Sequence, residues 1–233
     1  MKCIIASTST IYGSGYLAYL LDEIDIFFNK PKEVLFIPYA RPGGISHDAY
    51  TQKAQDAFEK IGAKVKGIHT YDSPEKAIQE AKFIFTGGGN TFLLVKKLHE
   101  LGLMLPLKKA ITNGTFYLGT SAGSNICGPT IMTTNDMPIV YPPSFNSLGI
   151  LNFNINPHYL DPLPNSTHKG ETRETRIKEF LQQNKVSVLG LREGSWIAVN
   201  GQEIYLRGEL SARVFKAASS PYELSTNTSL IGL

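Results

Sequence analysis

The chain has few cysteines, little net charge and no long apolar stretch. Only two of its 233 residues are cysteines, Cys3 and Cys127, which argues against a disulfide framework and favours a reducing compartment. A net charge of +3 without a run of Lys or Arg gives no support for nucleic acid or an anionic membrane as a partner. No segment approaches the roughly 18 apolar residues of a membrane span, and the N-terminal apolar run is too short for a secretory signal. We therefore expect a cytoplasmic protein without a membrane or nucleic-acid partner.

The composition is that of a globular protein. Hydrophobic residues make up 42% of the chain and charged residues 18%, and a chain of this length can bury a substantial core without disulfides or metals. No linker, internal repeat or low-complexity tract interrupts it. We therefore predict a single domain over residues 1–233.

Apolar runs alternate with amphipathic stretches along the first half of the chain. Continuously apolar runs predict strands at residues 3–6, 33–37, 64–68 and 82–86. Helical spacing predicts helices at 16–28 and 47–61, and a third helix that begins at Pro74. Ser46 and Ser73 are the expected N-caps of the second and third helices. A fourth helix is predicted between the glycines at 87–89 and Leu101. From residue 153 onward, a helix at 171–183 mixes with strands at 186–191, 196–199 and 203–206.

This alternation predicts an α/β fold with a mostly parallel sheet covered by helices on both faces. In such sheets ligands bind beyond the carboxyl ends of the strands. Two loops have that position: Gly87-Gly88-Gly89, and the segment that follows the apolar run Phe116-Tyr117-Leu118.

The second of these loops carries a serine in the sequence Gly119-Thr120-Ser121-Ala122-Gly123. The pattern G-x-S-x-G after a strand is typical of a sharp strand-to-helix turn that exposes a nucleophilic hydroxyl. The backbone N–H of Ala122 would then lie at a helix start, where it can bind an oxyanion. The bare pattern is also compatible with an ordinary Gly/Ser turn, so the argument depends on partners elsewhere in the chain.

A nucleophilic serine needs a base, and His158 is the best placed of five histidines. It follows Asn156-Pro157 after an apolar segment, and so lies at a predicted strand end. His69 also follows a predicted strand, whereas His47 and His99 fall in predicted helices.

The base needs an acid that holds its tautomer. Glu193 follows the strand predicted at 186–191, and Asp136 lies in a polar loop between the serine and His158. Both are compatible with ordinary solvated loop charges, and the residues alone leave the two candidates open.

Two further segments are candidates for substrate contacts. Gly87-Gly88-Gly89 is compatible with a phosphate loop, a simple turn or the second half of an oxyanion hole; the last fits best, because no Gly-Lys-Ser/Thr follows. Arg173 and Arg176 are three residues apart on a predicted helix face, where they could pair with surface glutamates or select an acidic substrate.

Together these motifs resemble the peptidase E family of serine peptidases, the α-aspartyl dipeptidases. The matching stretches occur in the family's order at residues 85–92, 119–125, 129–138, 155–158 and 168–174. The resemblance implies a fold related to class I glutamine amidotransferases and hydrolysis of dipeptides with N-terminal aspartate, without metal or cofactor. Neither a monomer nor a dimer is favoured.

By the same resemblance, Ser121 is expected to be the nucleophile and His158 its base. Glu193 is favoured as the orienting acid, and Asp136 is kept as an active-site residue. Gly88 and Ala122 would supply the oxyanion donors, and substrate contacts would come from Arg176, with Arg173 and His168.

Two residues depart from the family pattern. Thr120 stands where a bulkier, often aromatic residue is expected, and Arg192 precedes Glu193 where a neutral residue is expected. Two rival functions remain: another hydrolase of this architecture, such as a cyanophycinase-like peptidase or an esterase, and a non-catalytic binding protein.

Overall fold

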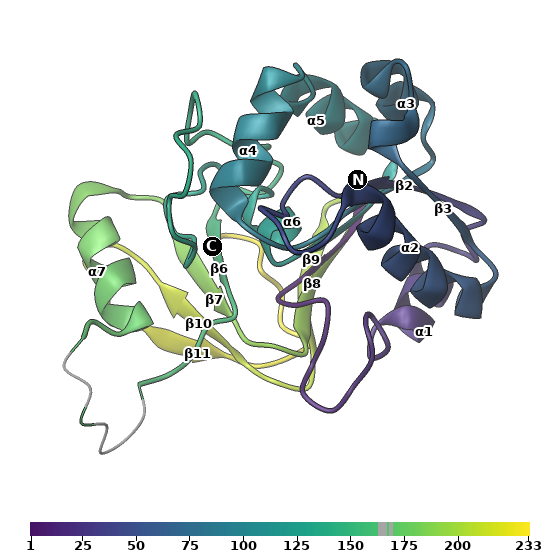
Figure 1. Ribbon diagram of the computed structural model, residues 1–233. Coiled ribbons are helices and arrows are strands. Elements are labelled where there is room, and N and C mark those ends of the chain that lie inside the picture. The colour runs from purple at the N-terminus through teal and green to yellow at the C-terminus, as the bar shows by residue number, and fades with distance from the viewer. Residues whose placement is uncertain (163–166, 168–169) are drawn as a thin grey trace.

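The computed structural model describes residues 1–162, 167 and 170–233. It contains two β-sheets with helices packed around them (Figure 1). The larger sheet has the strand order β3-β2-β4-β5-β1-β8-β9. In chain order its strands are β1 (Lys2–Ala6), β2 (Glu33–Ile37), β3 (Lys64–Gly67), β4 (Phe83–Thr86), β5 (Phe116–Thr120), β8 (Ser195–Asn200) and β9 (Glu203–Gly208).

The strands of this sheet from β3 to β1 are parallel, which confirms the predicted α/β architecture. β8 pairs antiparallel with β1, and β9 pairs antiparallel with β8, so one edge of the sheet departs from the parallel pattern. A second sheet of order β11-β10-β7-β6 was not predicted. Its strands are β6 (Asn154–Pro157), β7 (Val188–Leu191), β10 (Ala212–Phe215) and β11 (Tyr222–Leu224).

Helices cover both faces of the larger sheet, as predicted (Figure 1). Successive residues of β1 point to opposite faces: Cys3 and Ile5 pack into one core cluster, and Ile4 and Ala6 pack into the other. The first cluster includes side chains from α3 (Pro74–Glu80), α4 (Thr91–Glu100), α5 (Met104–Thr112) and α6 (Ala122–Asn125). The second includes side chains from α1 (Leu21–Phe27) and α2 (His47–Phe58).

The remaining helical elements are short or lie on the second sheet. Two 3₁₀ helices, η1 (Glu59–Ile61) and η2 (Ile68–Thr70), flank β3. α7 (Arg173–Gln183) covers the second sheet, where Ile177 packs with Tyr159, Val188 and Phe215. Within the described ranges, no helix is both long and apolar enough to cross a membrane.

Candidate active site

Ser121 occupies a strained turn between β5 and α6. Its backbone has φ 53° and ψ −110°, and α6 begins at the next residue. A β-carbon at Gly123 would lie 2.2 Å from the carbonyl oxygen of Thr86, and one at Gly119 would lie 2.5 Å from the carbonyl oxygen of Gly123. Both flanking glycines are therefore required by close packing. Such strain in a non-glycine residue is typical of a serine held on a nucleophile elbow.

His158 lies against this serine. Its Nε2 is 2.9 Å from Ser121 Oγ, and its Nδ1 is 2.6 Å from Glu193 Oε1. The imidazole is one-third exposed and the carboxylate nearly half exposed, so solvent reaches both. Three side chains far apart in the sequence thus form a hydroxyl, imidazole and carboxylate chain with the geometry of a catalytic triad.

The second sheet explains how His158 and Glu193 meet. β6 and β7 are parallel neighbours, and Pro157 is paired with Leu191 at their carboxyl ends. His158 directly follows the first of these residues, and Glu193 comes two residues after the second. The expectation that both side chains lie at strand ends is therefore correct.

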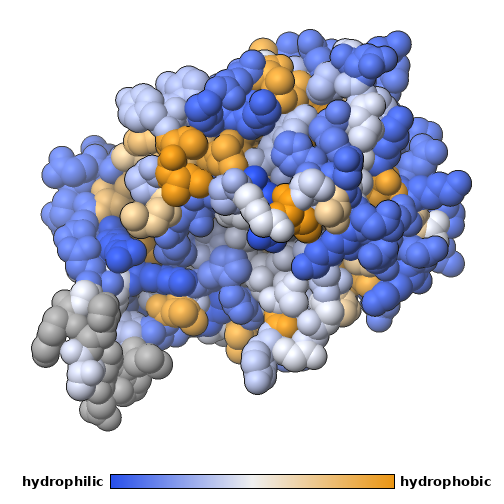
Figure 2. Space-filling view, viewed as in Figure 1, coloured by the Kyte–Doolittle hydropathy of each residue, from blue (hydrophilic) through white to orange (hydrophobic). Residues whose placement is uncertain are grey.

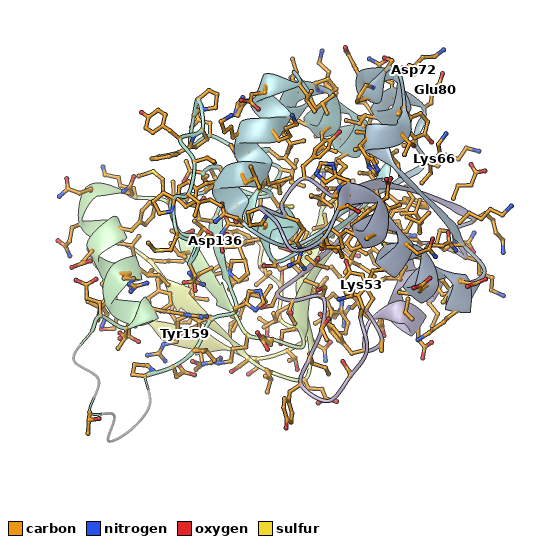
Figure 3. The ribbon with its side chains drawn as sticks, viewed as in Figure 1. Lys53, Lys66, Asp72, Glu80, Asp136 and Tyr159 are labelled. Carbon is orange, nitrogen blue, oxygen red and sulfur yellow. The ribbon has the colours of Figure 1, made fainter. Side chains whose placement is uncertain are left out.

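Asp136 has other partners. Its Oδ2 accepts the backbone N–H of Thr91 at 2.7 Å and the hydroxyl of Thr134 at 3.1 Å. Beside it, Asn90 caps α4 by accepting the N–H of Leu93 at 3.0 Å. Figure 3 shows Asp136 beside the end of α4. Both ring nitrogens of His158 face other groups, and Asp136 contacts the start of α4 and the loop that carries Thr134.

The glycine loop after β4 also reaches the serine. A β-carbon at Gly88 would lie 3.0 Å from the β-carbon of Ser121 and 3.6 Å from its Oγ. The buried Tyr50 hydroxyl on α2 donates to the Gly88 carbonyl at 3.1 Å, which holds the glycine loop beside Ser121. Ala122, the other expected oxyanion donor, is the first residue of α6. No sequence pattern singles out Tyr50, because its contact with Gly88 joins two distant elements.

The two arginines of α7 differ in their surroundings. The Arg176 side chain is 61% exposed, and its Nε lies 3.8 Å from Glu171 Oε2. Arg173 is half-buried, and its Nη1 has no hydrogen-bond partner in the part of the chain that the structure describes. Burial lowers the pKa of Arg173 from its ordinary value, while the nearby charge of Glu193 raises it. Arg173 is thus the less exposed of the two arginines, and Glu193 is the carboxylate that acts on its pKa. His168 lies outside the described residues.

Comparison with known proteins identifies the family. The family model for peptidase family S51 matches residues 3–207. Peptidase E of Streptomyces coelicolor is 47% identical over 230 residues, which cover 99% of this chain and 93% of the relative. A probable alpha-aspartyl dipeptidase of Drosophila melanogaster is 44% identical over 225 residues, which cover 95% and 92%. The chain belongs to peptidase family S51. The family expected from the sequence is thereby confirmed.

Two solved structures share the fold of this S51 chain. A putative peptidase E protein from Listeria monocytogenes superposes with a TM-score of 0.65 at 22% identity, covering 89% of this chain and 98% of that one. A peptidase from an acI-B1 actinobacterium superposes with a TM-score of 0.72 at 16% identity, covering 98% and 96%. At these identities the comparison shows the fold alone. The specific relation to class I glutamine amidotransferases stays a prediction.

The charge of Arg192, unexpected beside Glu193, is neutralised by other carboxylates in this S51 chain. Its guanidinium donates to Asp161 at 2.7 Å and to Glu223 at 2.9 and 3.0 Å. The hydrogen bonds to Glu223 raise the pKa of Arg192, and the same bonds hold the pKa of Glu223 at about 2. Glu193 is left to bond with the imidazole.

Other candidate groups of the S51 chain have partners other than Ser121 or are buried. His69 bonds to Asp48 at 2.7 Å, so the alternative base has a different partner. Cys3 and Cys127 are buried, free thiols whose pKa values burial raises, to about 12 for Cys3. Among the described residues, no cluster of three His, Cys, Asp or Glu side chains has the arrangement of a metal site.

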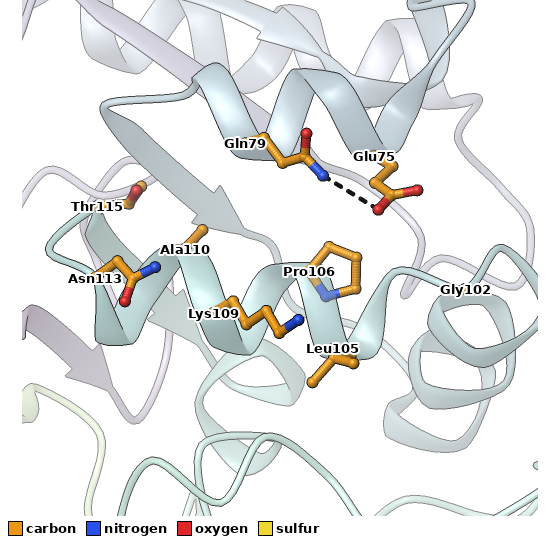
Figure 4. Close-up of a pocket in the computed structure, with 9 residues that line it drawn as sticks. All are labelled: Glu75, Gln79, Gly102, Leu105, Pro106, Lys109, Ala110, Asn113 and Thr115. Carbon is orange, nitrogen blue, oxygen red and sulfur yellow. Dashed lines mark hydrogen bonds between the residues drawn. The ribbon is translucent and has the colours of Figure 1, made fainter.

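Two further surface features are an exposed apolar segment and a groove. The connection between α6 and β6 exposes five large apolar side chains: Met132, Met137, Ile139, Tyr141 and Phe145. Figure 2 shows apolar side chains gathered beside α4. A groove of about 580 Å³ lies between α3 and α5 (Figure 4). None of the three triad residues lines that groove, so it is separate from the active site.

Proposed function

We propose that this chain is a serine dipeptidase that hydrolyses dipeptides with N-terminal aspartate. The observation that carries the proposal is the pair of contacts made by His158, 2.9 Å to the hydroxyl of Ser121 and 2.6 Å to the carboxylate of Glu193. The substrate class comes from relatives described as peptidase E and as a probable alpha-aspartyl dipeptidase. We expect the substrate to be a small dipeptide. We also expect the chain to form a single domain and to act in the cytoplasm.

In the acylation step, Ser121 Oγ attacks the carbonyl carbon of the N-terminal aspartate. His158 Nε2 accepts the hydroxyl proton as the new C–O bond forms, and Glu193 stabilises the resulting imidazolium. The N–H groups of Gly88 and Ala122 bind the oxyanion, and each such donor is worth ~3 kcal/mol of transition-state stabilisation. The C–N bond then breaks, and His158 returns the proton to the leaving amine.

Deacylation repeats these steps with water as the nucleophile. Water attacks the aspartyl ester on Ser121, and His158 takes one of its protons. When the ester C–O bond breaks, His158 gives that proton back to the serine oxygen. The enzyme is restored, with free aspartate and the second amino acid as products.

Recognition of the aspartate side chain is assigned to Arg173. A half-buried guanidinium pairs with a carboxylate more strongly than an exposed one, because less water competes for both groups. Arg173 meets this condition, with an unpaired Nη1 in the described structure, whereas Arg176 is exposed and faces Glu171. The sequence alone gave Arg176 the larger part.

A hydrolysis screen tests the activity. Dipeptides that differ only at the first residue, together with β-Asp-Arg and a p-nitrophenyl ester, separate an aspartyl dipeptidase from a cyanophycinase-like peptidase and an esterase. We expect Asp-Leu to be cleaved best and Ser121→Ala to lose several orders of magnitude in kcat. Normal cleavage by Ser121→Ala would contradict the proposal.

The same screen with two matched variants tests the specificity. Arg173→Gln should lower kcat/KM for Asp-Leu by roughly 10- to 150-fold, as expected for loss of a hydrogen bond between charged groups. Arg176→Gln removes the same charge one helical turn away and should change it little. If Arg176→Gln has the larger effect, the assignment of Arg173 is wrong.

A further inference from the structure

The end of β1 contacts the elbow that carries the nucleophile. The carbonyl oxygen of Ala6 accepts the backbone N–H of Ser121 at 3.2 Å and the hydroxyl of Ser124 at 2.6 Å. β1 and β5 are parallel neighbours, and Ala6 is paired with Thr120. The position of Ser121 is therefore set by the last residue of β1.

The next residue, Ser7, contacts the base. Its Oγ accepts the backbone N–H of His158 at 2.8 Å and donates to the carbonyl oxygen of Leu191 at 2.7 Å. Its own N–H donates to the carbonyl oxygen of Ser195 at 3.0 Å. Ser7 is fully buried. One hydroxyl thus joins the ends of β6 and β7, which precede His158 and Glu193, to the end of β1, which contacts Ser121.

His158 needs such support because its backbone is strained. Its φ is 55°, in the left-handed region that non-glycine residues avoid. Strained residues of this kind persist when the surrounding contacts fix them. The N–H that Ser7 accepts belongs to this strained residue. By accepting this N–H, the Ser7 hydroxyl stabilises the backbone dihedral angles of His158, which set the direction of its imidazole.

We propose that Ser7 is a positioning residue that holds the imidazole of His158 within hydrogen-bond distance of the hydroxyl of Ser121. The role rests on the proposed function, in which these two groups exchange a proton. Ala6 fixes the nucleophile and Ser7 fixes the base, so two adjacent residues set the distance between side chains from different sheets.

Ser7→Ala removes the hydroxyl and leaves the backbone unchanged. We expect kcat for Asp-Leu to fall roughly 10- to 100-fold, the size of effect that a displacement of about 1 Å produces, with KM unchanged. Ser195→Ala is the matched control, because Ser195 is equally buried and donates one hydrogen bond to a carbonyl oxygen, that of Leu210 at 2.8 Å. This control should keep the wild-type kcat.

A spectroscopic measurement separates this role from the proposed function. The proton between His158 Nδ1 and Glu193 should give a far-downfield NMR resonance, assigned by its loss in His158→Ala. In Ser7→Ala we expect that resonance to shift or broaden, and in Ser195→Ala to stay in place. If the wild type cleaves no Asp-X dipeptide, the proposed function fails, while the resonance still tests Ser7.

Two results with Ser7→Ala would overturn the inference. One is a Ser7→Ala variant with kcat within two-fold of the wild type. The other is a lower kcat with an unchanged resonance, because Ser7 would then act by another route. If Ser7→Ala does not fold, Ser7→Cys fills nearly the same volume with a weaker hydrogen-bonding group. An intermediate kcat in Ser7→Cys supports the inference, and a wild-type kcat refutes it.

Discussion

At the scale of single residues, each ring nitrogen of His158 has one partner. Nε2 faces the hydroxyl of Ser121 and Nδ1 faces the carboxylate of Glu193. A ring whose two nitrogens face a hydroxyl and a carboxylate is held in one tautomer, with the proton on the nitrogen nearest the carboxylate. Asp136 instead accepts the N–H of Thr91 at the start of α4. The two carboxylates that the sequence left open therefore have different partners, and we expect separable tasks for them.

A pair of isosteric variants tests this separation. Glu193→Gln should lower kcat by roughly three to four orders of magnitude, because an amide can hold the wrong imidazole tautomer and cannot stabilise the imidazolium. Asp136→Asn should keep kcat within a few-fold of the wild type. It should lower the free energy of unfolding by about 0.3–1 kcal/mol, because a negative charge is lost at a helix N-terminus. Steady-state kinetics and urea unfolding measure the two effects.

The opposite ranking would contradict the assignment. If Asp136→Asn lost more activity than Glu193→Gln, Asp136 would be the orienting acid. Circular dichroism of both variants at the assay temperature provides the control that each remains folded.

The turn at Ser121 could be predicted from the sequence, because it depends on immediate neighbours. Ser121 was identified because the glycines that permit its turn flank it directly. The contact between Glu193 and His158 depends on the pairing of β6 with β7, and the different burial of Arg173 and Arg176 depends on tertiary packing. Neither is encoded by local spacing.

At the scale of secondary structure, local signals located the helix starts with clear caps. Ser46 and Ser73 cap α2 and α3 as predicted, by accepting the N–H groups of Ala49 and Lys76. The helix predicted at 16–28 is shorter, because Leu17 has φ 58° and α1 begins only at Leu21.

The helix and strands that were not predicted from the sequence, α5, β10 and β11, depend on tertiary contacts. α5 carries Pro106 within its first turn, where a proline is tolerated, but its pattern was not distinctive. β10 and β11 are short, and both pairings of β10 are antiparallel. Short strands of this kind are stabilised by their partners rather than by their own composition.

The contact between α2 and the glycine loop yields a prediction at this scale. Tyr50→Phe removes only the hydroxyl that donates to the Gly88 carbonyl. The loop should then hold its oxyanion donor less firmly, so we expect kcat to fall several-fold with KM unchanged. The free energy of unfolding should fall by about 1 kcal/mol, as for loss of one hydrogen bond. Steady-state kinetics with Asp-Leu and urea unfolding measure both effects.

Tyr16→Phe is the matched control for that substitution. The hydroxyl of Tyr16 lies 3.4 Å from that of Tyr50 and donates to it, one step removed from the loop. It should therefore change kcat less than Tyr50→Phe. Equal losses in the two variants would mean that the contact with Gly88 has no special effect on catalysis.

At the scale of the whole molecule, the active site joins two sheets. Ser121 follows a strand of the parallel sheet that the alternating pattern predicted, whereas His158 and Glu193 follow strands of the second sheet, which that pattern missed. The sequence placed each of the three residues at a strand end, and the resemblance assigned them to one site, but a contact between residues 121, 158 and 193 is a property of the tertiary structure. We therefore expect the proposed activity to depend on the stability of the second sheet.

An ion-pair network supports the second sheet beside Glu193. Arg192, directly after β7, bonds to Glu223 on β11 and to Asp161. Hydrogen bonds from Arg192 are the main cause of the low pKa of Glu223, about 2 compared with an ordinary value of 4.5. Because the pKa is lower in the folded state, the ionised carboxylate stabilises that state above about pH 4.5. This stabilisation is lost as the pH falls toward 2.

The network therefore predicts how stability depends on pH. Glu223 is 42% exposed, so solvent screening limits its contribution to about 1 kcal/mol. Glu223→Gln should lower the free energy of unfolding by about that amount at pH 6, and the difference from the wild type should vanish near pH 2. Urea unfolding at several pH values measures it, with the exposed Glu203→Gln on β9 as the control. If the free energy of unfolding of both variants depends on pH as that of the wild type does, the network does not stabilise the fold. Glu223 would then not have a lowered pKa in solution.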